Sequence, residues 1–224
     1  MNIVITGVSK GIGAAVLDKF VQGGHRVLAF SSSKSIINNY KNAVIKPLDF
    51  YDFEEDAIAQ VIAGEFKQVD ILVNNAGVLL NASFEDTTAG DWEKTFTVNL
   101  FGTVKIIKSA LPQLKASPDA HIVNIGSMGG FQGSSKFPGL AAYSASKAAV
   151  ANLTECLAEE FKNDNIHVNC LALGAVNTEM LNAAFPGYKA PVESNEIAEF
   201  ISDFCINKRK FFNGKIIPVA VSTP

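Results

Sequence analysis

The amino-acid sequence predicts an α/β fold in which a doubly wound, seven-stranded parallel sheet carries helices on both faces. Short apolar runs alternate along the chain with longer segments of helical periodicity, which is typical of such a sheet. Hydrophobic residues make up 48% of the 224 residues and charged residues 18%, which suits a large two-faced core. A glycine-rich turn follows the first apolar run. We therefore expect one domain over residues 1–224, with right-handed crossovers and the strand order 3-2-1-4-5-6-7.

The first half of the chain is predicted to supply four strands and two helices. The first helix begins in the glycine-rich turn, and Gly23 and Gly24 end it, because glycine accepts the left-handed conformation found past a helix C-terminus. The second helix carries Ile58, Val61 and Ile62 on one side. The predicted strands cover residues 3–5, 26–30, 43–48 and 71–73, and the helices cover residues 11–22 and 53–66.

The second half continues the alternation. Two long helical segments, 91–115 and 141–162, flank a strand at 121–125, and a further strand follows at 167–173. Ser194 is predicted to be the N-cap of a last helix that carries Ile197, Phe200, Ile201 and Phe204. A strand at 216–219 completes the sheet.

Composition excludes several classes of protein. A net charge of −3 with scattered basic residues argues against nucleic-acid binding, which takes a basic face. The sequence contains no stretch of about 20 apolar residues that could span a membrane, and the first residues show no secretory signal. The three cysteines, Cys156, Cys170 and Cys205, lack metal-ligand spacing and are each flanked by apolar residues, so we expect buried thiols and no metal site. These features favour a cytoplasmic protein.

The glycine-rich turn runs from Thr6 to Gly13 with the spacing G-x-x-x-G-x-G. In a Rossmann-type domain Gly7 would permit the tight turn, Gly11 would let a phosphate approach the backbone, and Gly13 would let the helix pack closely on the strand. The helix N-terminus would then offer N–H groups to a pyrophosphate. An ordinary strand-to-helix turn is the alternative, but the position at the first crossover favours dinucleotide binding.

The segment after the second strand bears on the choice of cofactor. An acidic residue there would bind the ribose 2′-hydroxyl, but the chain reads Phe30-Ser31-Ser32-Ser33-Lys34. The hydroxyls and Lys34, with Lys10 from the glycine turn, are suited to hold a 2′-phosphate. We expect NADP(H) to be preferred over NAD(H), unless Lys34 is only a solvated residue and both cofactors bind.

Tyr143 and Lys147 are four residues apart at the start of a predicted helix, which puts both side chains on one face. A free phenol has a pKa near 10, too high for efficient acid–base catalysis near neutrality. A neighbouring ammonium and an oxidised nicotinamide ring would both favour the phenolate and lower the pKa of the phenol.

With these motifs in order, the chain resembles the short-chain dehydrogenase/reductase family over nearly its whole length. The matching features are the turn Thr6–Gly13, Asp49 after the third strand, Asn74-Asn75-Ala76-Gly77 after the fourth, Asn99 in the long helix, Ser127 after the fifth strand, and Tyr143-x-x-x-Lys147.

The resemblance implies a role for each matching residue. Tyr143 would protonate the carbonyl oxygen, Lys147 would hold the nicotinamide ribose and lower the Tyr143 pKa, and Ser127 would bind the substrate oxygen. Asn99 would distort its helix and hold a water that links Lys147 to solvent. Asp49 and Phe50 would flank the adenine, Asn75 would contact the cofactor, and Val176 would touch the carboxamide through its backbone. The implied cofactor-binding residues are Gly7, Ser9, Lys10, Gly11, Ile12, Gly13, Ser31, Ser32, Ser33, Asp49, Phe50, Asn75, Ala76, Gly77, Tyr143, Lys147, Gly174, Val176 and Thr178.

The chain departs from the family pattern near the expected substrate pocket. Leu173-Gly174 replaces the usual Pro-Gly, the interval from Ser127 to Tyr143 is longer than usual, and the segment 178–194 leaves room for only a small lid. Lys136 is the one candidate for a charged substrate anchor. Apolar lid residues would face the pocket or pack against the sheet; these are Met180, Leu181, Phe185 and Tyr188, opposite Phe131 and Leu79.

The sequence thus predicts an oxidoreductase that transfers a hydride between NADP(H) and a small carbonyl or alcohol substrate. A catalytically silent NADP(H)-binding sensor, and an epimerase or dehydratase of the same fold, are the alternatives. The two long helices are apolar beyond what one sheet face can cover, and the resemblance implies that they pair between subunits in a homodimer or homotetramer.

Overall fold

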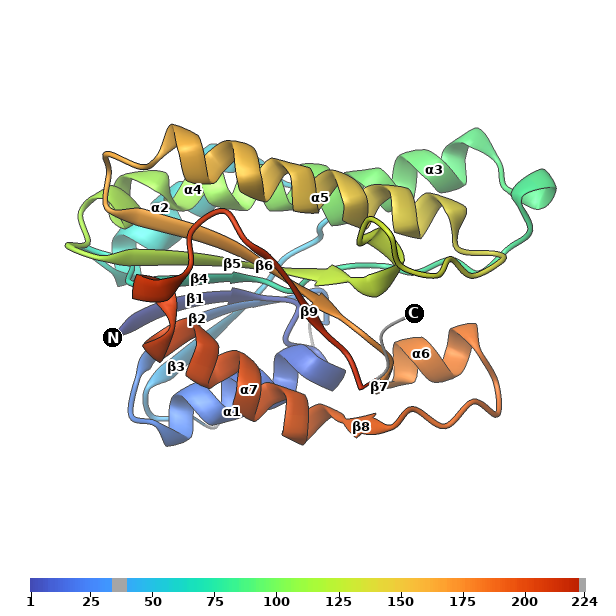
Figure 1. Cartoon of the computed structure of the whole chain (residues 1–224). Helices are drawn as coiled ribbons and strands as arrows, with labels where there is room; N and C mark the ends of the chain where they lie inside the picture. The colour runs from blue at the N-terminus through green and yellow to red at the C-terminus, as the bar shows by residue number, and fades with distance from the viewer. Residues whose placement is uncertain (34–39, 222–224) are drawn as a thin grey trace.

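Seven parallel strands form the central sheet of the computed structural model, which describes residues 1–33 and 40–221. Their order, β3-β2-β1-β4-β5-β6-β9, confirms the predicted topology (Figure 1). Two short strands intervene before the seventh, which is therefore labelled β9. The strands are β1 (Asn2–Thr6), β2 (Arg26–Ser31), β3 (Ala43–Pro47), β4 (Ile71–Asn74), β5 (Ala120–Ser127), β6 (Ile166–Leu173) and β9 (Ile216–Val219).

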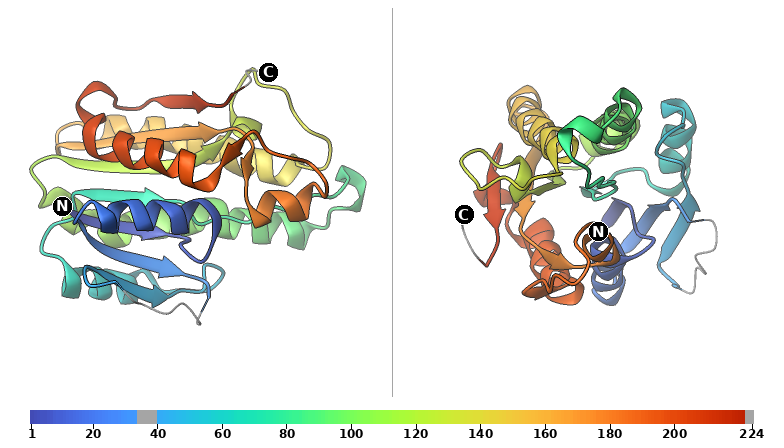
Figure 2. Two further views of the ribbon diagram at one scale, coloured as in Figure 1. Left: turned by 90° about the horizontal axis from the view of Figure 1, so that it is seen from below. Right: turned by 90° about the vertical axis from the view of Figure 1, so that its right-hand side faces the viewer.

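Helices cover both faces of this sheet, and each face has its own apolar layer (Figure 2). Successive residues of a strand point to opposite faces, so Ile3 and Ile5 of β1 join one layer while Val4 joins the other. This two-sided burial explains why the strands read as continuous apolar runs. One layer packs under α1 (Gly11–Gln22) and α7 (Ser194–Asn207), and the other under α2 (Glu55–Glu65), α4 (Gly102–Lys115) and α5 (Ala141–Glu160).

The long helical region before β5 is divided into three parts. The helix α3 (Ala89–Phe96) passes through a π-helical turn, η2 (Thr97–Phe101), into α4. Asn99 lies inside the π turn, so the predicted local distortion at this residue is confirmed. Such turns occur often at functional sites, because they re-aim a side chain without ending the helix.

A small substructure that the sequence did not predict lies at the carboxyl ends of the strands. The two-residue strands β7 (Val176–Asn177) and β8 (Val192–Glu193) pair in parallel, and the short helix α6 (Glu179–Ala184) lies between them in sequence (Figure 1). Hydrogen bonds from Asn177 Nδ2 to the Glu193 carboxylate, 2.9 and 3.1 Å long, reinforce the pair. Strands this short offer no periodicity by which a sequence could reveal them.

The start of the last helix differs from the prediction. Glu193, not Ser194, is the N-cap of α7, and it forms a capping box with Glu196. The Ser194 hydroxyl instead donates to the Asn177 carbonyl at 2.9 Å, because the chain enters the helix directly from β8. The second helix also starts two residues later than predicted, at Glu55, which leaves Phe53 free to pack in the core.

The cysteines differ in exposure. Cys170 and Cys205 are buried as expected, but Cys156 is exposed, so the expectation of three buried thiols was wrong for this residue. Cys156 lies on α5, where buried positions recur at Val150, Thr154 and Ala158, and it falls outside that stripe. Within residues 1–33 and 40–221, no helix is both long and apolar enough to cross a membrane.

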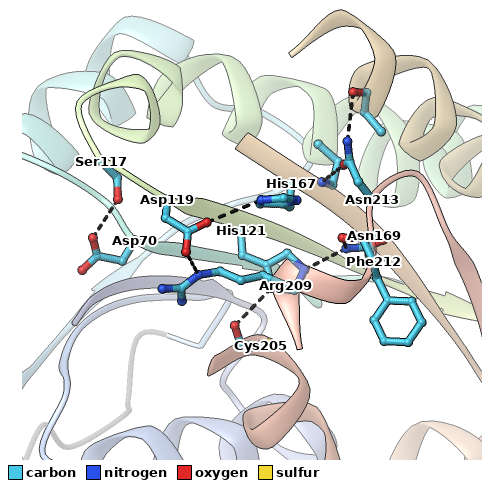
Figure 3. A network of polar contacts seen from close by, with 12 residues as sticks. Asp70, Ser117, Asp119, His121, His167, Asn169, Cys205, Arg209, Phe212 and Asn213 are labelled. Atoms are coloured by element: carbon cyan, nitrogen blue, oxygen red, sulfur yellow. Dashed lines mark hydrogen bonds and ion pairs between the residues drawn. The ribbon is translucent and has the colours of Figure 1, made fainter. Parts of the chain in front are cut away.

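A polar network, buried at His121 and Asn169, ties α7 and the segment 209–213 to the amino ends of β5 and β6 (Figure 3). His121 Nδ1 lies 3.1 Å from the Cys205 carbonyl, and His121 Nε2 lies 3.0 Å from Asn169 Nδ2. A carbonyl can only accept and an amide nitrogen can only donate, so the neutral ring carries its proton on Nδ1. Burial lowers the pKa of His121 to about 4. Beside it, Asp119 pairs with Arg209 and lies 3.5 Å from His167 Nε2.

The strand β9 forms one edge of the sheet and contains Pro218. Its ladder to β6 includes hydrogen bonds from Cys170 N to the Lys215 carbonyl and from Gly174 N to the Val219 carbonyl, both 2.9 Å. Pro218 lies opposite Ala172 in this register.

Candidate active site

The glycine-rich turn between β1 and α1 has the geometry of a phosphate cradle. Gly7 and Gly11 have positive φ angles of 75° and 59°, a conformation that side chains other than glycine rarely adopt. A Cβ on Gly13 would lie 2.1 Å from the Gly7 carbonyl oxygen, so only glycine fits there. The first turn of α1 contains no acidic residue, and its N-cap, Lys10, makes no side-chain capping bond. The helix N-terminus therefore keeps N–H groups and a positive dipole end for an anion.

Asn75 holds this turn in place from the end of β4. Its Nδ2 donates to the carbonyls of Thr6 and Gly7 at 3.2 and 2.9 Å. In return, Thr6 Oγ1 accepts hydrogen bonds from the backbone N–H groups of Asn75 and Ala76, both at 3.1 Å. The Asn75 side chain, expected to contact the cofactor, is thus engaged with the protein and shapes the cradle. Thr6, which the sequence analysis gave no structural role, is its partner.

The expected adenosine side of the site is described only in part. Ser31 is fully buried, and its hydroxyl exchanges hydrogen bonds with the backbone of Ser33. Ser32 is exposed, as is Lys10 in the glycine turn. Lys34, the other predicted partner of a 2′-phosphate, lies outside the described residues.

Asp49 and Phe50, the predicted neighbours of the adenine, lie in different environments. Asp49 is exposed, and its Oδ1 accepts a hydrogen bond from Tyr51 N at 2.9 Å. The Phe50 ring is buried and meets Phe53 edge-on, with ring centroids 6.1 Å apart. The Phe50 ring is thus part of the core layer under α2 and α4, and its contact with an adenine stays a prediction.

The predicted acid–base pair lies on the first turns of α5, next to the carboxyl end of β5. Lys147 Nζ donates to the Ile125 carbonyl at 2.8 Å and lies 5.9 Å from the centroid of the Tyr143 ring. The Ser127 side chain interacts with Tyr143 and also accepts a hydrogen bond from Gly129 N at 3.1 Å. The structure therefore brings Ser127, Tyr143 and Lys147 together.

Burial dominates the protonation of this group. It lowers the pKa of Lys147 to about 8, an effect that the neighbouring Cys170 opposes. Burial also raises the pKa of Tyr143 above its ordinary value of 10, and the interaction with Ser127 only partly offsets this. The sequence predicted a lowered Tyr143 pKa from the lysine and an oxidised nicotinamide ring together, and of these two the structure contains only the lysine. In the structure the loss of water around the phenol has the larger effect.

Asn99 connects the π turn to the loop after β4. Its Oδ1 accepts a hydrogen bond from Val78 N at 2.8 Å, while its Nδ2 donates to the Val78 carbonyl at 3.0 Å and to Ser146 Oγ at 2.9 Å. Ser146 Oγ donates in turn to the Tyr143 carbonyl at 2.7 Å. Asn99 therefore positions both the 78 loop and the first turn of α5. Ser146 is a functional neighbour that the sequence reasoning missed, although it follows Tyr143 by three residues on a helix.

Residues 75–77 form the physical link between the glycine turn and the acid–base pair. A Cβ on Gly7 would lie 2.7 Å from Ala76 Cα, so the two backbones touch. On the other side, a Cβ on Gly77 would lie 3.2 Å from Asn99 Oδ1 and 3.5 Å from Lys147 Nζ. Side chains at these positions would push the two halves of the site apart.

The last predicted contacts lie around the end of β6. Gly174 is closely packed, since a Cβ there would lie 2.8 Å from the Ala220 side chain. Val176 is buried in β7. Thr178 Oγ1 caps α6 by accepting a hydrogen bond from Leu181 N at 3.1 Å. The Thr178 methyl group packs next to Gly11, 3.3 Å from the position that a Cβ would take there. Of the remaining predicted contacts, Ser9 lies in the glycine turn and Ile12 in the first turn of α1, and both are half-buried.

The wall of the expected substrate pocket is held by a residue that the sequence analysis did not single out. Asn81 Nδ2 donates to the Ala184 carbonyl at the end of α6, at 2.7 Å. A Cβ on Gly139 would lie 1.9 Å from Asn81 Oδ1, and Ala82 N donates to the Gly139 carbonyl at 3.1 Å. Asn81 thus joins three loops that are distant in sequence, which no local pattern could reveal.

Lys136, the predicted substrate anchor, folds back on its own loop. Its Nζ donates to the Phe131 carbonyl at 2.6 Å and to Ser134 Oγ at 2.7 Å. It lines two hollows of about 390 and 410 Å³ along the loop 129–141, and neither has Tyr143 or Lys147 in its wall. Among the predicted lid residues, Met180 and Tyr188 are exposed, while Leu181 and Phe185 are half-buried.

Taken together, the chain's own residues fit a bound dinucleotide. The cradle excludes side chains at Gly7 and Gly13, and the start of α1 offers uncapped N–H groups for a diphosphate. Lys147 lies one loop away with its ammonium beside the Tyr143 ring. A phenol, an ammonium and a hydroxyl gathered at one point can bind an oxygen atom and move a proton to or from it.

Comparisons with known proteins agree with this geometry. The family model described as "short chain dehydrogenase" matches residues 1–189. An uncharacterized oxidoreductase of Staphylococcus saprophyticus is 31% identical over 206 residues, which cover 88% of this chain and 87% of that protein. A solved structure of ElxO with NADP bound is 27% identical with a TM-score of 0.85, and the match covers 98% of this chain and 96% of that one. A 3-ketoacyl-(acyl-carrier-protein) reductase from Brucella melitensis complexed with NADH has the same fold, with 24% identity, a TM-score of 0.88 and the same coverage.

Proposed function

Because the chain belongs to the short-chain dehydrogenase family, we propose that it is an NADP(H)-dependent oxidoreductase that interconverts a small carbonyl compound and its alcohol. One observation carries the proposal. Tyr143, Lys147 and Ser127 meet at the carboxyl ends of the central strands, one loop away from a phosphate cradle. Ligands of open α/β sheets bind at this edge.

The nicotinamide supplies the hydride when it is bound, and the protein aims it and handles the proton. During reduction, Ser127 Oγ and the Tyr143 hydroxyl hold the substrate oxygen. The phenol then gives its proton to that oxygen as negative charge develops there. The raised pKa of Tyr143 suits this direction, because the phenol keeps its proton at neutral pH until the substrate oxygen demands it.

Lys147 acts on the same step through its charge. With a pKa of about 8 the ammonium is mostly protonated at neutral pH, and it stabilises the phenolate left after proton transfer. Asn99 and Ser146 fix the backbone on which Tyr143 stands. The hydrogen bond from Lys147 to the Ile125 carbonyl keeps the ammonium near the ring.

NADP(H) is proposed as the preferred cofactor on the strength of the segment after β2. Phe30 is followed by three serines at 31–33 and then by Lys34, with no acidic residue that would repel a 2′-phosphate. Lys10 is exposed at the glycine turn and offers positive charge nearby. Relatives of this fold include structures bound to NADP and to NADH, so the fold is compatible with either cofactor.

Kinetic screening tests the proposal. Oxidation of NADPH and NADH is followed at 340 nm with a panel of ketones, aldehydes and quinones, using wild-type protein and Tyr143→Phe. We expect turnover with NADPH that depends on Tyr143. Tight binding of NADPH without turnover of any substrate would instead favour the catalytically silent sensor.

We also propose that two copies associate through the outer faces of the helical layer that contains α4 and α5. Phe101, the last residue of η2, is 54% exposed, a large apolar surface for one side chain. Light scattering tests this, and a monomer across the micromolar range would contradict it.

A further inference from the structure

A carboxylate lies at the rim of the glycine turn. Glu179 Oε2 is 3.6 Å from the position that a Cβ would take on Gly11, and Thr178 Cγ2 is 3.3 Å from the same point. Glu179 is exposed, and within the described parts of the chain it makes no hydrogen bond or ion pair. Its carboxylate is therefore held near Gly11 by the course of the backbone and not by a side-chain partner.

The turn beside it attracts negative charge. The first turn of α1 contains no acidic residue, and Lys10 at the N-cap makes no side-chain capping bond. The N–H groups at this end give it the equivalent of about half a positive charge, which favours any nearby anion. A phosphate group and the Glu179 carboxylate are therefore drawn to the same place, and they repel each other.

We infer that Glu179 competes with the pyrophosphate of the cofactor for the glycine turn and thereby weakens cofactor binding. The inference rests on the proposed function, because it takes the pyrophosphate to bind at this turn. It adds a residue that determines cofactor affinity from outside the turn, on a helix that belongs to the substrate side of the site.

Glu179 stands at the start of the helix that is the expected lid. Glu179 is the first residue of α6, and Ala184 at the other end accepts the hydrogen bond from Asn81. A diphosphate at Gly11 would drive the exposed Glu179 carboxylate away by rotation of its side chain. The hydrogen bond from Leu181 N to Thr178 Oγ1 holds the first turn of α6 in place, so the competition is between charges and needs no movement of the helix.

The expected effect follows from Coulomb's law. Two charges about 5 Å apart at a protein surface repel enough to change a dissociation constant about three- to tenfold. Glu179→Gln removes the charge and keeps the shape of the side chain, so the mutant should bind NADPH about three- to tenfold more tightly. Glu179→Lys should bind it more tightly still. Salt screens exposed charges, so both gains should shrink at high ionic strength.

Isothermal titration calorimetry with NADPH tests the inference on the full-length protein at about 0.02 M and about 0.5 M salt. Glu160→Gln is the matched control, because Glu160 is an exposed acid at the end of α5, about 25 Å along the helix from Tyr143. We expect affinity to rise in the order Glu, Gln, Lys at position 179 and to stay unchanged in Glu160→Gln.

The outcomes separate the inference from the proposed function. If the wild type binds NADPH and Glu179→Gln binds it equally or less tightly, the inference is wrong and the proposed function stands. If both variants at 179 gain affinity by the same factor at both salt concentrations, the effect is not electrostatic and the inference also fails. If the wild type binds neither NADPH nor NADH, the proposed function is wrong and the inference falls with it.

Discussion

Lys147 and Ile125 are joined by a hydrogen bond of 2.8 Å from the ammonium to the backbone carbonyl, which pins the lysine of α5 to the end of β5. The bond holds a charged group in a place that water hardly reaches, since Lys147 is 6% exposed. Burial lowers the pKa of Lys147 to about 8, so the side chain loses its charge at a lower pH than a free lysine does.

This pKa predicts the pH dependence of reduction. We expect kcat/KM for carbonyl reduction to fall as the pH rises through about 8, because the neutral amine no longer stabilises the Tyr143 phenolate. The measurement is a pH–rate profile between pH 6 and pH 10 with the best substrate of the panel. A profile that stays flat to pH 10 would show that the charge of Lys147 does not matter for the step.

Tyr143→Phe should bind NADPH as the wild type does and lose turnover by at least about a hundredfold, because it removes the proton donor and keeps the ring. Calorimetry measures the first property and the NADPH absorbance the second. Ser144→Ala is the control, since Ser144 lies on the adjacent face of α5 and lines a hollow away from Tyr143. Turnover within a few-fold of wild type in Tyr143→Phe would contradict the assigned role.

Two Gly→Ala substitutions should differ in effect, because a methyl group clashes at Gly13 and meets open space at Gly64. Gly13→Ala puts a methyl group 2.1 Å from the Gly7 carbonyl oxygen, so the glycine turn must shift and NADPH affinity should fall at least tenfold. Gly64→Ala, inside α2, meets nothing within 4 Å and should stabilise the protein by about 0.5–1 kcal/mol. Thermal unfolding and calorimetry measure both. The pair would fail as a test of the cradle if Gly13→Ala bound NADPH normally.

Asn81→Asp should loosen the lid. The carboxylate cannot donate to the Ala184 carbonyl and repels it, so the bond that holds the end of α6 is lost. We expect hydrogen exchange to speed up several-fold at the amides of Asn182 and Phe185, which bond within α6 to Thr178 and Leu181. Asn152→Asp makes the same change on an exposed part of α5. Unchanged exchange in Asn81→Asp would mean that the lid is held by other contacts.

His121 predicts how stability changes in acid. Its pKa is lowered from 6.5 to about 4 by burial, so the unfolded chain binds a proton more readily than the folded one between these values. The contribution to stability is fully present above pH 6.5 and is lost as the pH falls toward 4. His121→Asn removes the ring that bonds to Cys205 and Asn169, so urea unfolding should show a lower free energy of unfolding at pH 7. The variant also lacks the titrating imidazole, so it should lose less stability between pH 6.5 and pH 4. An acid loss equal to that of the wild type would exclude His121 as its source.

The sequence analysis predicted those parts of the molecule that repeat or pair locally. The order of the sheet strands follows from alternating apolar runs, and the distortion at Asn99 and the pairing of Tyr143 with Lys147 followed from motif resemblance and helical spacing. The cap of α7 was assigned to Ser194 because serine is a common cap. The chain enters from β8, however, and this places Glu193 at that position.

Other features depend on contacts that no local pattern encodes. Asn81 meets Ala184 across about a hundred residues of chain, and Glu179 approaches Gly11 from the opposite end of the sequence. The direction of the Tyr143 pKa also depended on burial. A neighbouring lysine and a bound nicotinamide predicted a lower pKa, but the packing that excludes water around the phenol was not visible in the sequence.

Pro218 has a consequence for how copies of this protein can meet. The carbonyls of Lys215 and Val219 point toward β6. Because successive residues of a strand alternate in direction, Pro218, which precedes Val219, turns its backbone to the free edge of β9. Proline has no amide hydrogen, and an incoming strand would find no donor at the middle of this four-residue edge. The fold thus disfavours fibril-like growth by strand addition at this border.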